Sequence, residues 1–146
     1  MSIATRAATT VWDGDLESGN GTFADTSSGV LDGQRVTWGS RTVAPAGKSS
    51  PEELLAAAHS SCFSMALALT LGQHQSPPER LEVGAEVALD EVDGVPTIAT
   101  SKITVRGTVP GLDAAAFAGI VDEAAGLCPV SRLFAGAEIT VDAQLV

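Results

Sequence analysis

The sequence predicts an α+β fold in which a single domain spans residues 1–146. Glycine-rich turns divide the first third of the chain into short extended segments. A long apolar segment in the middle has the length and the start signal of a helix, and alternating apolar residues indicate strands after it. With 45% hydrophobic and 18% charged residues, a chain of 146 residues is able to bury a sizeable core.

The first third of the chain is predicted to form a β meander. Turn residues at Asp13-Gly14 and again over 18–21 separate short extended segments. A further strand is expected over 34–43, before Pro45 and Gly47 introduce a loop.

The long central helix is predicted to begin at Pro51, because Ser50 is a good N-cap residue and Glu53 completes a capping box. Glu52 has no role in this capping box. Its simplest interpretation is a solvated carboxylate that interacts favourably with the helix dipole. Residues at helical spacing further along predict a buried stripe that includes Cys62. The stripe comprises Leu55, Ala58, Cys62, Met65 and Leu69.

The segment from Leu54 to Leu71 is long and apolar enough to raise the question of a membrane span. It contains His59 and three serines, it is rich in alanine, and no basic residues flank it. We therefore expect a buried central helix and no membrane partner.

Strands are predicted again in the second half of the chain. Apolar and polar residues alternate from Leu81 to Asp90, and Asp93-Gly94 indicates a turn. Apolar residues at every second position then predict a further strand that carries Ile103, Val105, Gly107 and Val109. A last strand is expected over 138–145.

Two short helices are expected between those last two strands. Asp113 is the expected cap of the first, and Gly126 indicates its end. Its predicted core-facing residues are Phe117, Ile120, Val121 and Ala124. Pro129 is the expected first residue of the second helix, which places Cys128 at a helix start, where a thiolate is favoured.

Charge and composition limit the classes of molecule that this protein is expected to bind. The net charge of −10 and the absence of a basic cluster argue against nucleic acid or an anionic membrane surface. A small uncharged substrate is expected instead. The mean hydropathy of +0.22 predicts a subunit interface. The first twelve residues lack the pattern of a secretory signal, so cytoplasmic localisation is expected.

The two cysteines are the candidates for chemistry. In a reducing cytosol they are expected to be inert thiols, metal ligands or redox groups. His59 precedes Cys62 by one helical turn, and with Cys128 the three could form a zinc site. Because only three ligands converge, a packed or hydrogen-bonded histidine is favoured over a metal site.

Several segments together resemble the family of osmotically induced protein C and organic hydroperoxide resistance proteins. They are SPEELLAAAHSSCFSMALAL, GLCPVS, VWDGDLESGNGTF and SGVLDGQ. The first two are more similar to the osmotically induced branch. The resemblance covers nearly the whole chain and implies the OsmC-like fold, an intertwined homodimer with central helices between two sheets. It also implies a cysteine-based peroxidase that acts on organic hydroperoxides.

The resemblance implies a role for each of four residues. Cys62 would be the peroxidatic cysteine and Cys128 the resolving one. Arg41, on the strand predicted before the helix, would hold the peroxide, with Arg35 as the alternative. Glu52 would pair with this arginine and orient it.

The thiol chemistry follows from the residues themselves. A Cys62 thiolate attacks the peroxide, and the resulting sulfenic acid condenses with Cys128, so that no metal or organic cofactor is required. Full ionisation of a cysteine would accelerate attack only about 30-fold, or about 2 kcal/mol. Fast reduction therefore needs a cation such as an arginine beside the departing oxygen.

Helix geometry separates Glu52 from Cys62. Ten residues span about 15 Å along a straight helix and differ by about 80° around it. Either the helix bends, or Arg41 and Glu52 come from the other subunit, which is the hypothesis we favour.

Apolar side chains near Cys62 are expected to favour bulky alkyl peroxides, by about 0.8 kcal/mol per buried methylene. The candidates are Leu54, Leu55, Phe63, Met65 and Phe117. A dithiol is the expected reductant, and the resemblance points to lipoyl-bearing proteins as its source. A redox sensor or thiol-binding module that does not turn over, and a structural dimer with incidental cysteines, are the alternatives.

Overall fold

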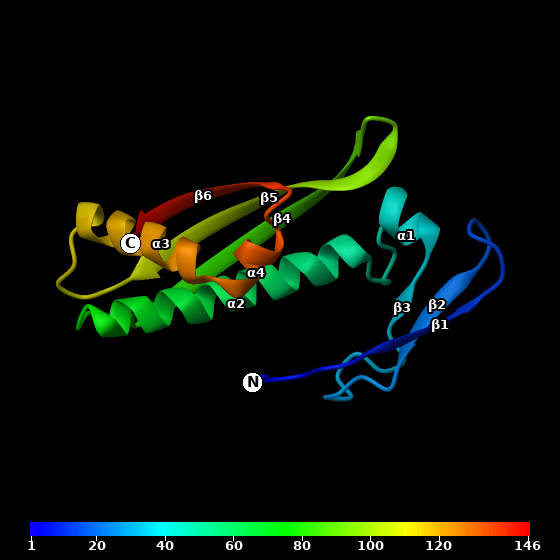
Figure 1. Cartoon of the computed structure of the whole chain (residues 1–146), viewed down its shortest axis with the longest axis horizontal. Coiled ribbons are helices and arrows are strands. Elements are labelled where there is room, and N and C mark those ends of the chain that lie inside the picture. The colour runs from blue at the N-terminus through cyan, green and yellow to red at the C-terminus, as the bar shows by residue number, and fades with distance from the viewer. The chain divides into compact units, whose positions relative to one another are not determined.

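A computed structural model describes all residues from Met1 to Val146 (Figure 1). Contacts divide the chain into two compact units, Met1–Pro51 and Glu52–Val146. The first unit contains a small sheet and a short helix. The second contains the two cysteines, a larger sheet and three helices.

The first unit is built on the predicted β meander. Its strands are β1 (Thr9–Asp13), β2 (Asn20–Ala24) and β3 (Arg35–Val36), paired antiparallel in the order β1-β2-β3. Residues 14–19 connect β1 to β2, and the predicted turn residues on either side of them belong to the strands. The predicted β meander is confirmed.

The predicted strand over 34–43 is wrong in its second half, where the chain forms the short helix α1 (Trp38–Thr42). Thr37 caps it: the Thr37 hydroxyl accepts from the Ser40 N–H at 3.0 Å, and the Ser40 hydroxyl accepts from the Thr37 N–H at 2.9 Å. This reciprocal capping box satisfies two backbone donors and stabilises a helix in a segment with β propensity. Arg41 therefore lies on a helix and not on a strand.

The second unit contains α2 (Pro51–Gln73), which begins at the predicted proline. Its sheet comprises β4 (Arg80–Val92), β5 (Val95–Thr108) and β6 (Glu138–Leu145) in the order β4-β5-β6. The hairpin of β4 and β5 turns at Asp93-Gly94 as predicted, and β6 runs parallel to β5. A parallel pair requires a long crossover, which α3 (Ala114–Leu127) and α4 (Pro129–Leu133) supply.

The core of the second unit lies between one face of the sheet and the helices (Figure 1). Residues at alternate positions of β5 are buried, whereas Lys102 and Arg106 between them are exposed. Asp113 caps α3 by accepting from the Ala116 N–H at 2.8 Å, and the four predicted core-facing residues of α3 are all buried. The predictions for these elements are confirmed.

The buried stripe predicted for α2 is wrong. Met65 and Leu69 are 72% and 61% exposed in the single chain, whereas the buried residues of the helix are His59, Phe63, Leu67, Thr70 and Leu71. The physical reason is that α2 is apolar around most of its circumference, so spacing does not select one face. By length and composition α2 could cross a membrane, a weak indication because core helices meet the same criterion.

Candidate active site

The two cysteines meet in the second unit, although they are far apart in the sequence. Cys62 lies near the middle of α2, and Cys128 is the residue between α3 and α4. Both are free thiols; Cys62 is half-buried and Cys128 is fully buried. Cys62 packs against the buried cluster that contains Cys128, and each thiol influences the pKa of the other. The fold thus brings two cysteines that are distant in the sequence into one part of the core.

Local sequence fixes the position of Cys128. The Cys128 N–H donates to the Ala124 carbonyl at 3.0 Å and closes α3, while Pro129 takes the first position of α4. Cys128 itself has extended backbone angles (φ −65°, ψ 116°). The side chain at the sharp corner between two helices is therefore held by backbone geometry rather than by packing alone.

The two thiols differ in acidity. Burial raises the pKa of Cys62, and contact with Cys128 raises it further, although the Val130 N–H has the opposite effect. Burial also acts to raise the pKa of Cys128, but hydrogen bonds from the Ser131 hydroxyl and N–H, together with Cys62 and the Val130 N–H, outweigh it and leave this pKa lowered. Within one chain, Cys128 is therefore the thiol that ionises more readily.

His59 is hydrogen-bonded at both ring nitrogens, as the sequence favoured. Nδ1 lies 2.7 Å from the Ser101 hydroxyl on β5, and Nε2 lies 2.8 Å from the Ser131 hydroxyl on α4. The ring also contacts Phe134, with centroids 5.2 Å apart. Burial lowers the pKa of His59, which keeps the ring neutral. Both ring nitrogens are engaged by hydroxyls, an arrangement that does not present them to a metal.

Arg41 lies in the first unit, on α1, with its guanidinium carbon 6.0 Å from the centre of the Trp38 ring. It lines an apolar pocket of about 130 Å³. The other residues that line this pocket are Trp12, Leu16, Val36, Thr37, Trp38 and Pro51. The alternative, Arg35, is exposed on β3 and donates to the Asn20 side-chain oxygen at 2.8 Å. Of Arg41 and Arg35, Arg41 is therefore the one that borders an apolar pocket.

Glu52 lies in the first turn of α2 and is half-buried. The helix continues unbroken from there past Cys62 (Figure 1), and no proline or glycine interrupts the segment between them. The separation of about 15 Å along the axis therefore applies, and a bend does not bring Glu52 to Cys62 of its own helix.

The predicted substrate-contacting residues occupy three settings. Leu54 and Leu55 are half-buried in the first turns of α2, and Met65 is exposed. Phe63 and Phe117 are fully buried in the core cluster that also contains Cys128. Contact of these five residues with a substrate remains a prediction.

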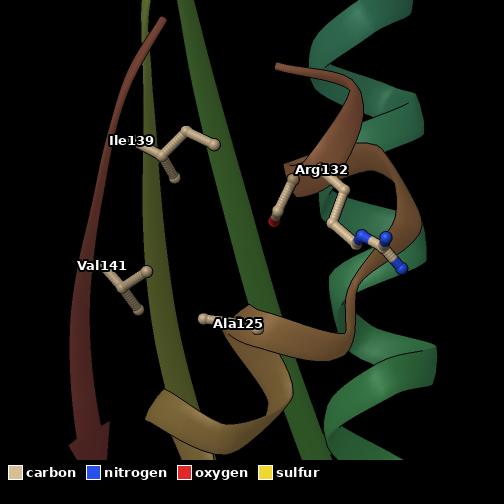
Figure 2. A pocket seen from close by; sticks show the side chains of 6 residues that line it. Ala125, Arg132, Ile139 and Val141 are labelled. Carbon is tan, nitrogen blue, oxygen red and sulfur yellow. The ribbon is translucent and has the colours of Figure 1, made fainter. Parts of the chain in front are cut away.

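A second cavity lies between α4 and the sheet (Figure 2), with a volume of about 270 Å³. Ile139 and Val141 of β6 and Ala125 of α3 line it, while the guanidinium of Arg132 points away from the strands. Ser131, the partner of His59, also borders this cavity. Sequence reasoning missed Ser101 and Ser131, because their contacts with His59 join three elements that are distant in the chain and carry no local motif.

Comparisons with known proteins identify the family. Residues 44–144 match the model of the family described as OsmC-like protein. The chain is 44% identical over 136 residues to the peroxiredoxin OsmC of Escherichia coli (strain K12), and the match covers 92% of each chain. It is 36% identical over 87 residues to an organic hydroperoxide resistance protein-like protein of Mycoplasma pneumoniae, or 59% of this chain and 60% of that one.

Solved structures share the fold. The organic hydroperoxide resistance protein OhrB of Bacillus subtilis superposes with a TM-score of 0.75 at 24% identity, covering 99% of this chain and 100% of that chain. The organic hydroperoxide resistance protein OsmC of Legionella pneumophila gives a TM-score of 0.76 at 19% identity, with 99% of each chain covered. From the family match and the sequence identity, the chain belongs to the OsmC-like protein family.

Proposed function

We propose that this protein is a thiol-dependent peroxidase that reduces organic hydroperoxides to alcohols. The observation that carries the proposal is the packing of Cys62 against the buried cluster that contains Cys128, where each thiol influences the pKa of the other. The names of the relatives, a peroxiredoxin and organic hydroperoxide resistance proteins, support the same class of reaction.

The first step is assigned to Cys62. Its thiolate attacks the terminal peroxide oxygen, the O–O bond breaks, and the alkoxide leaves and takes a proton to become the alcohol. Cys62 becomes a sulfenic acid. Its partial exposure supports this role, because a peroxide must reach the sulfur, whereas Cys128 is fully buried.

The second step is assigned to Cys128. Its thiolate attacks the sulfur of the Cys62 sulfenic acid, a disulfide forms, and the oxygen leaves as hydroxide and is protonated to water. The lowered pKa of Cys128 supports this step, because the attacking group must be a thiolate. An external dithiol then reduces the disulfide, and lipoyl-bearing proteins are the proposed natural source. The two thiols carry both electrons, so the proposed cycle uses no metal or organic cofactor.

Ionisation of Cys62 requires a group beyond those of unit Glu52–Val146, because burial and Cys128 together raise its pKa. We assign this role to Arg41, oriented by Glu52, and place both in the partner subunit of a homodimer. Two features support the assignment: Arg41 borders an apolar pocket with Trp12 and Trp38, and α2 exposes Met65 and Leu69 on an apolar face. Such a pocket suits the alkyl group of an organic peroxide.

A redox sensor that does not turn over is the second candidate function, since the same thiol contact would serve a switch. Consumption of an alkyl hydroperoxide with excess dithiothreitol distinguishes the two. The proposal predicts many equivalents of peroxide consumed per subunit by wild type and none above background by Cys62→Ser. Disulfide formation that stops after one equivalent, despite the dithiol, would support the sensor.

A further inference from the structure

A largely buried hydrogen-bonded chain leads from the sheet to Ser131, in the first turn of the helix that begins after Cys128. It runs from Ser101 on β5 to His59 on α2, and from His59 to Ser131 on α4, with distances of 2.7 and 2.8 Å. Ser131 occupies the third position of α4, and Cys128 is the N-cap of that helix. A side chain at the third position reaches back toward the N-cap residue, and Ser131 lowers the pKa of the Cys128 thiol, which agrees with a position of its hydroxyl beside the sulfur.

The number of protons fixes the direction of these hydrogen bonds. A hydroxyl has one proton to donate, and a neutral imidazole has one donor and one acceptor nitrogen. If Ser131 donates to the Cys128 thiolate, its oxygen must accept from His59, so Nε2 carries the ring proton. Nδ1 then accepts from the Ser101 hydroxyl, for which His59 is the one hydrogen-bond partner. In the opposite tautomer Nδ1 carries the ring proton, and Ser131 would donate its hydroxyl proton to Nε2 of His59. That proton would then not be available for a hydrogen bond to the Cys128 sulfur.

We propose that His59 is a positioning residue that holds the Ser131 hydroxyl as a donor to the Cys128 sulfur and so prepares Cys128 to attack oxidised Cys62. The role in disulfide formation rests on the proposed function, whereas the hydrogen-bonded chain itself does not. The burial of His59 and Ser101, both 0% exposed, keeps water from replacing either partner. Phe134 packs against the ring at a tilt of 35°.

Apart from Cys62, no ionisable group close to Cys128 takes the place of the Ser131 hydroxyl as a hydrogen-bond donor to its sulfur. Cys62 and His59 face it from α2, and Ser131 faces it from α4. The charged residues of α3, α4 and β5 are exposed; they are Asp122 and Glu123 on α3, Arg132 on α4, and Lys102 and Arg106 on β5. On α2 the charged residues are Glu52, which is half-buried, and Glu53, which is exposed; both lie in the first turn, about two turns before His59. Ionisation of Cys128 is therefore expected to respond to Cys62 and to the Ser131 hydroxyl more than to these distant charges.

The test measures Cys128 ionisation by thiolate absorbance in a Cys62→Ser background, which isolates one thiol. Ser131→Ala and His59→Phe are expected to move the titration midpoint to higher pH. Ser131→Thr keeps the hydroxyl and His59→Gln keeps a donor and an acceptor, so both are expected to restore the midpoint. Thr70→Val is the matched control, because Thr70 is a fully buried hydroxyl that bonds only within α2.

Rapid-quench mass spectrometry with Cys62 intact, after one equivalent of alkyl hydroperoxide, separates sulfenic acid formation from disulfide formation. Below the midpoint, Ser131→Ala is expected to lower the thiolate fraction about tenfold, as loss of a hydrogen bond to a charged group predicts. The second step slows less, about threefold, because a less acidic thiolate is the better nucleophile. Well above the midpoint the deficit vanishes, which a misplaced side chain would not produce.

An unchanged midpoint in Ser131→Ala, or a loss of rate that is equal at every pH, would overturn the proposal. If His59→Phe does not fold, the pair Ser131→Ala and Ser131→Thr still decides it. If wild type forms no sulfenic acid, the proposed function fails, whereas the titration still decides whether His59 and Ser131 control the Cys128 thiolate.

Discussion

Cys62 packs against the buried cluster that contains Cys128, so the contact joins the corner between α3 and α4 to the middle of α2. The fold creates this juxtaposition by closing α3 with the Cys128 N–H and starting α4 at Pro129. The contact makes the acidity of each thiol a property of the pair, so that loss of one sulfur changes the chemistry of the other.

Removal of the resolving thiol should separate the two steps. In Cys128→Ser, one equivalent of alkyl hydroperoxide should convert Cys62 to a sulfenic acid that persists, because no neighbouring thiolate condenses with it. Trapping with dimedone followed by mass spectrometry measures this species. Wild type treated in the same way should show little adduct. Abundant adduct on Cys128 in wild type would reverse the assigned roles.

Complementation tests whether the arginine comes from the partner subunit. Arg41→Met and Cys62→Ser are each expected to lose most activity, by about 10²-fold or more for removal of a group that stabilises transition-state charge. In a mixed dimer, the intact Cys62 of one subunit meets the partner subunit's Arg41, so co-expression should restore one working site. No recovery in purified mixed dimers would place Arg41 and Cys62 in the same subunit. Arg35→Met is the matched control.

The exposed apolar face of α2 is expected to be covered by a second copy. Met65→Lys and Leu69→Lys introduce charges at positions that are 72% and 61% exposed in the single chain, so folding of one chain should tolerate them. Each should weaken self-association, since burial of a leucine or methionine contributes about 1.5–3 kcal/mol. Sedimentation velocity with circular dichroism measures both properties. A charged variant that remains fully dimeric would contradict this use of the face.

Two glycine substitutions test the packing of the second unit. A Cβ at Gly107 of β5 would lie 2.7 Å from the Phe117 ring, so Gly107→Ala should lower the free energy of unfolding by about 1–3 kcal/mol. Gly119, on α3, has open space around a Cβ, and Gly119→Ala should raise stability by about 0.5–1 kcal/mol. Urea denaturation measures both. Equal effects of the two changes would contradict the packing of α3 on β5.

His59 should make stability fall in mild acid. Burial lowers its pKa in the folded chain, so below the ordinary value of about 6.5 the unfolded chain binds a proton that the folded chain does not. The contribution is fully present above about pH 6.5, and below it the stability falls by at most about 1.4 kcal/mol per pH unit. Denaturation of wild type and His59→Gln at about pH 7.5 and pH 5 measures the difference, which should shrink in the variant. An identical pH dependence in both would contradict a neutral buried ring.

Local signals predicted much of the fold. The alternation from Leu81 to Asp90, the turn at Asp93-Gly94 and the cap at Asp113 are each encoded by a few adjacent residues, and the structure has all three. The helix α1 was missed because its capping box uses Thr37 and Ser40 within a segment that otherwise has β propensity.

Only those site residues could be predicted from the sequence whose type is rare and chemically reactive. Cysteines are rare in this chain, so Cys62 and Cys128 stood out, whereas serines are common and Ser101 and Ser131 did not. The buried face of α2 was not predictable either, because an apolar helix gives no preference until the sheet packs on it. Arg41 and Glu52 came from the family resemblance and not from residue spacing.

The most direct measurement is the product of a single turnover. Reduced protein without any added reductant is mixed with one equivalent of an alkyl hydroperoxide, and non-reducing peptide mass spectrometry follows. The predicted result is one equivalent of alcohol together with a disulfide that joins Cys62 to Cys128 within one chain. Free thiols with unreacted peroxide, or disulfides only between subunits, would contradict the central claim.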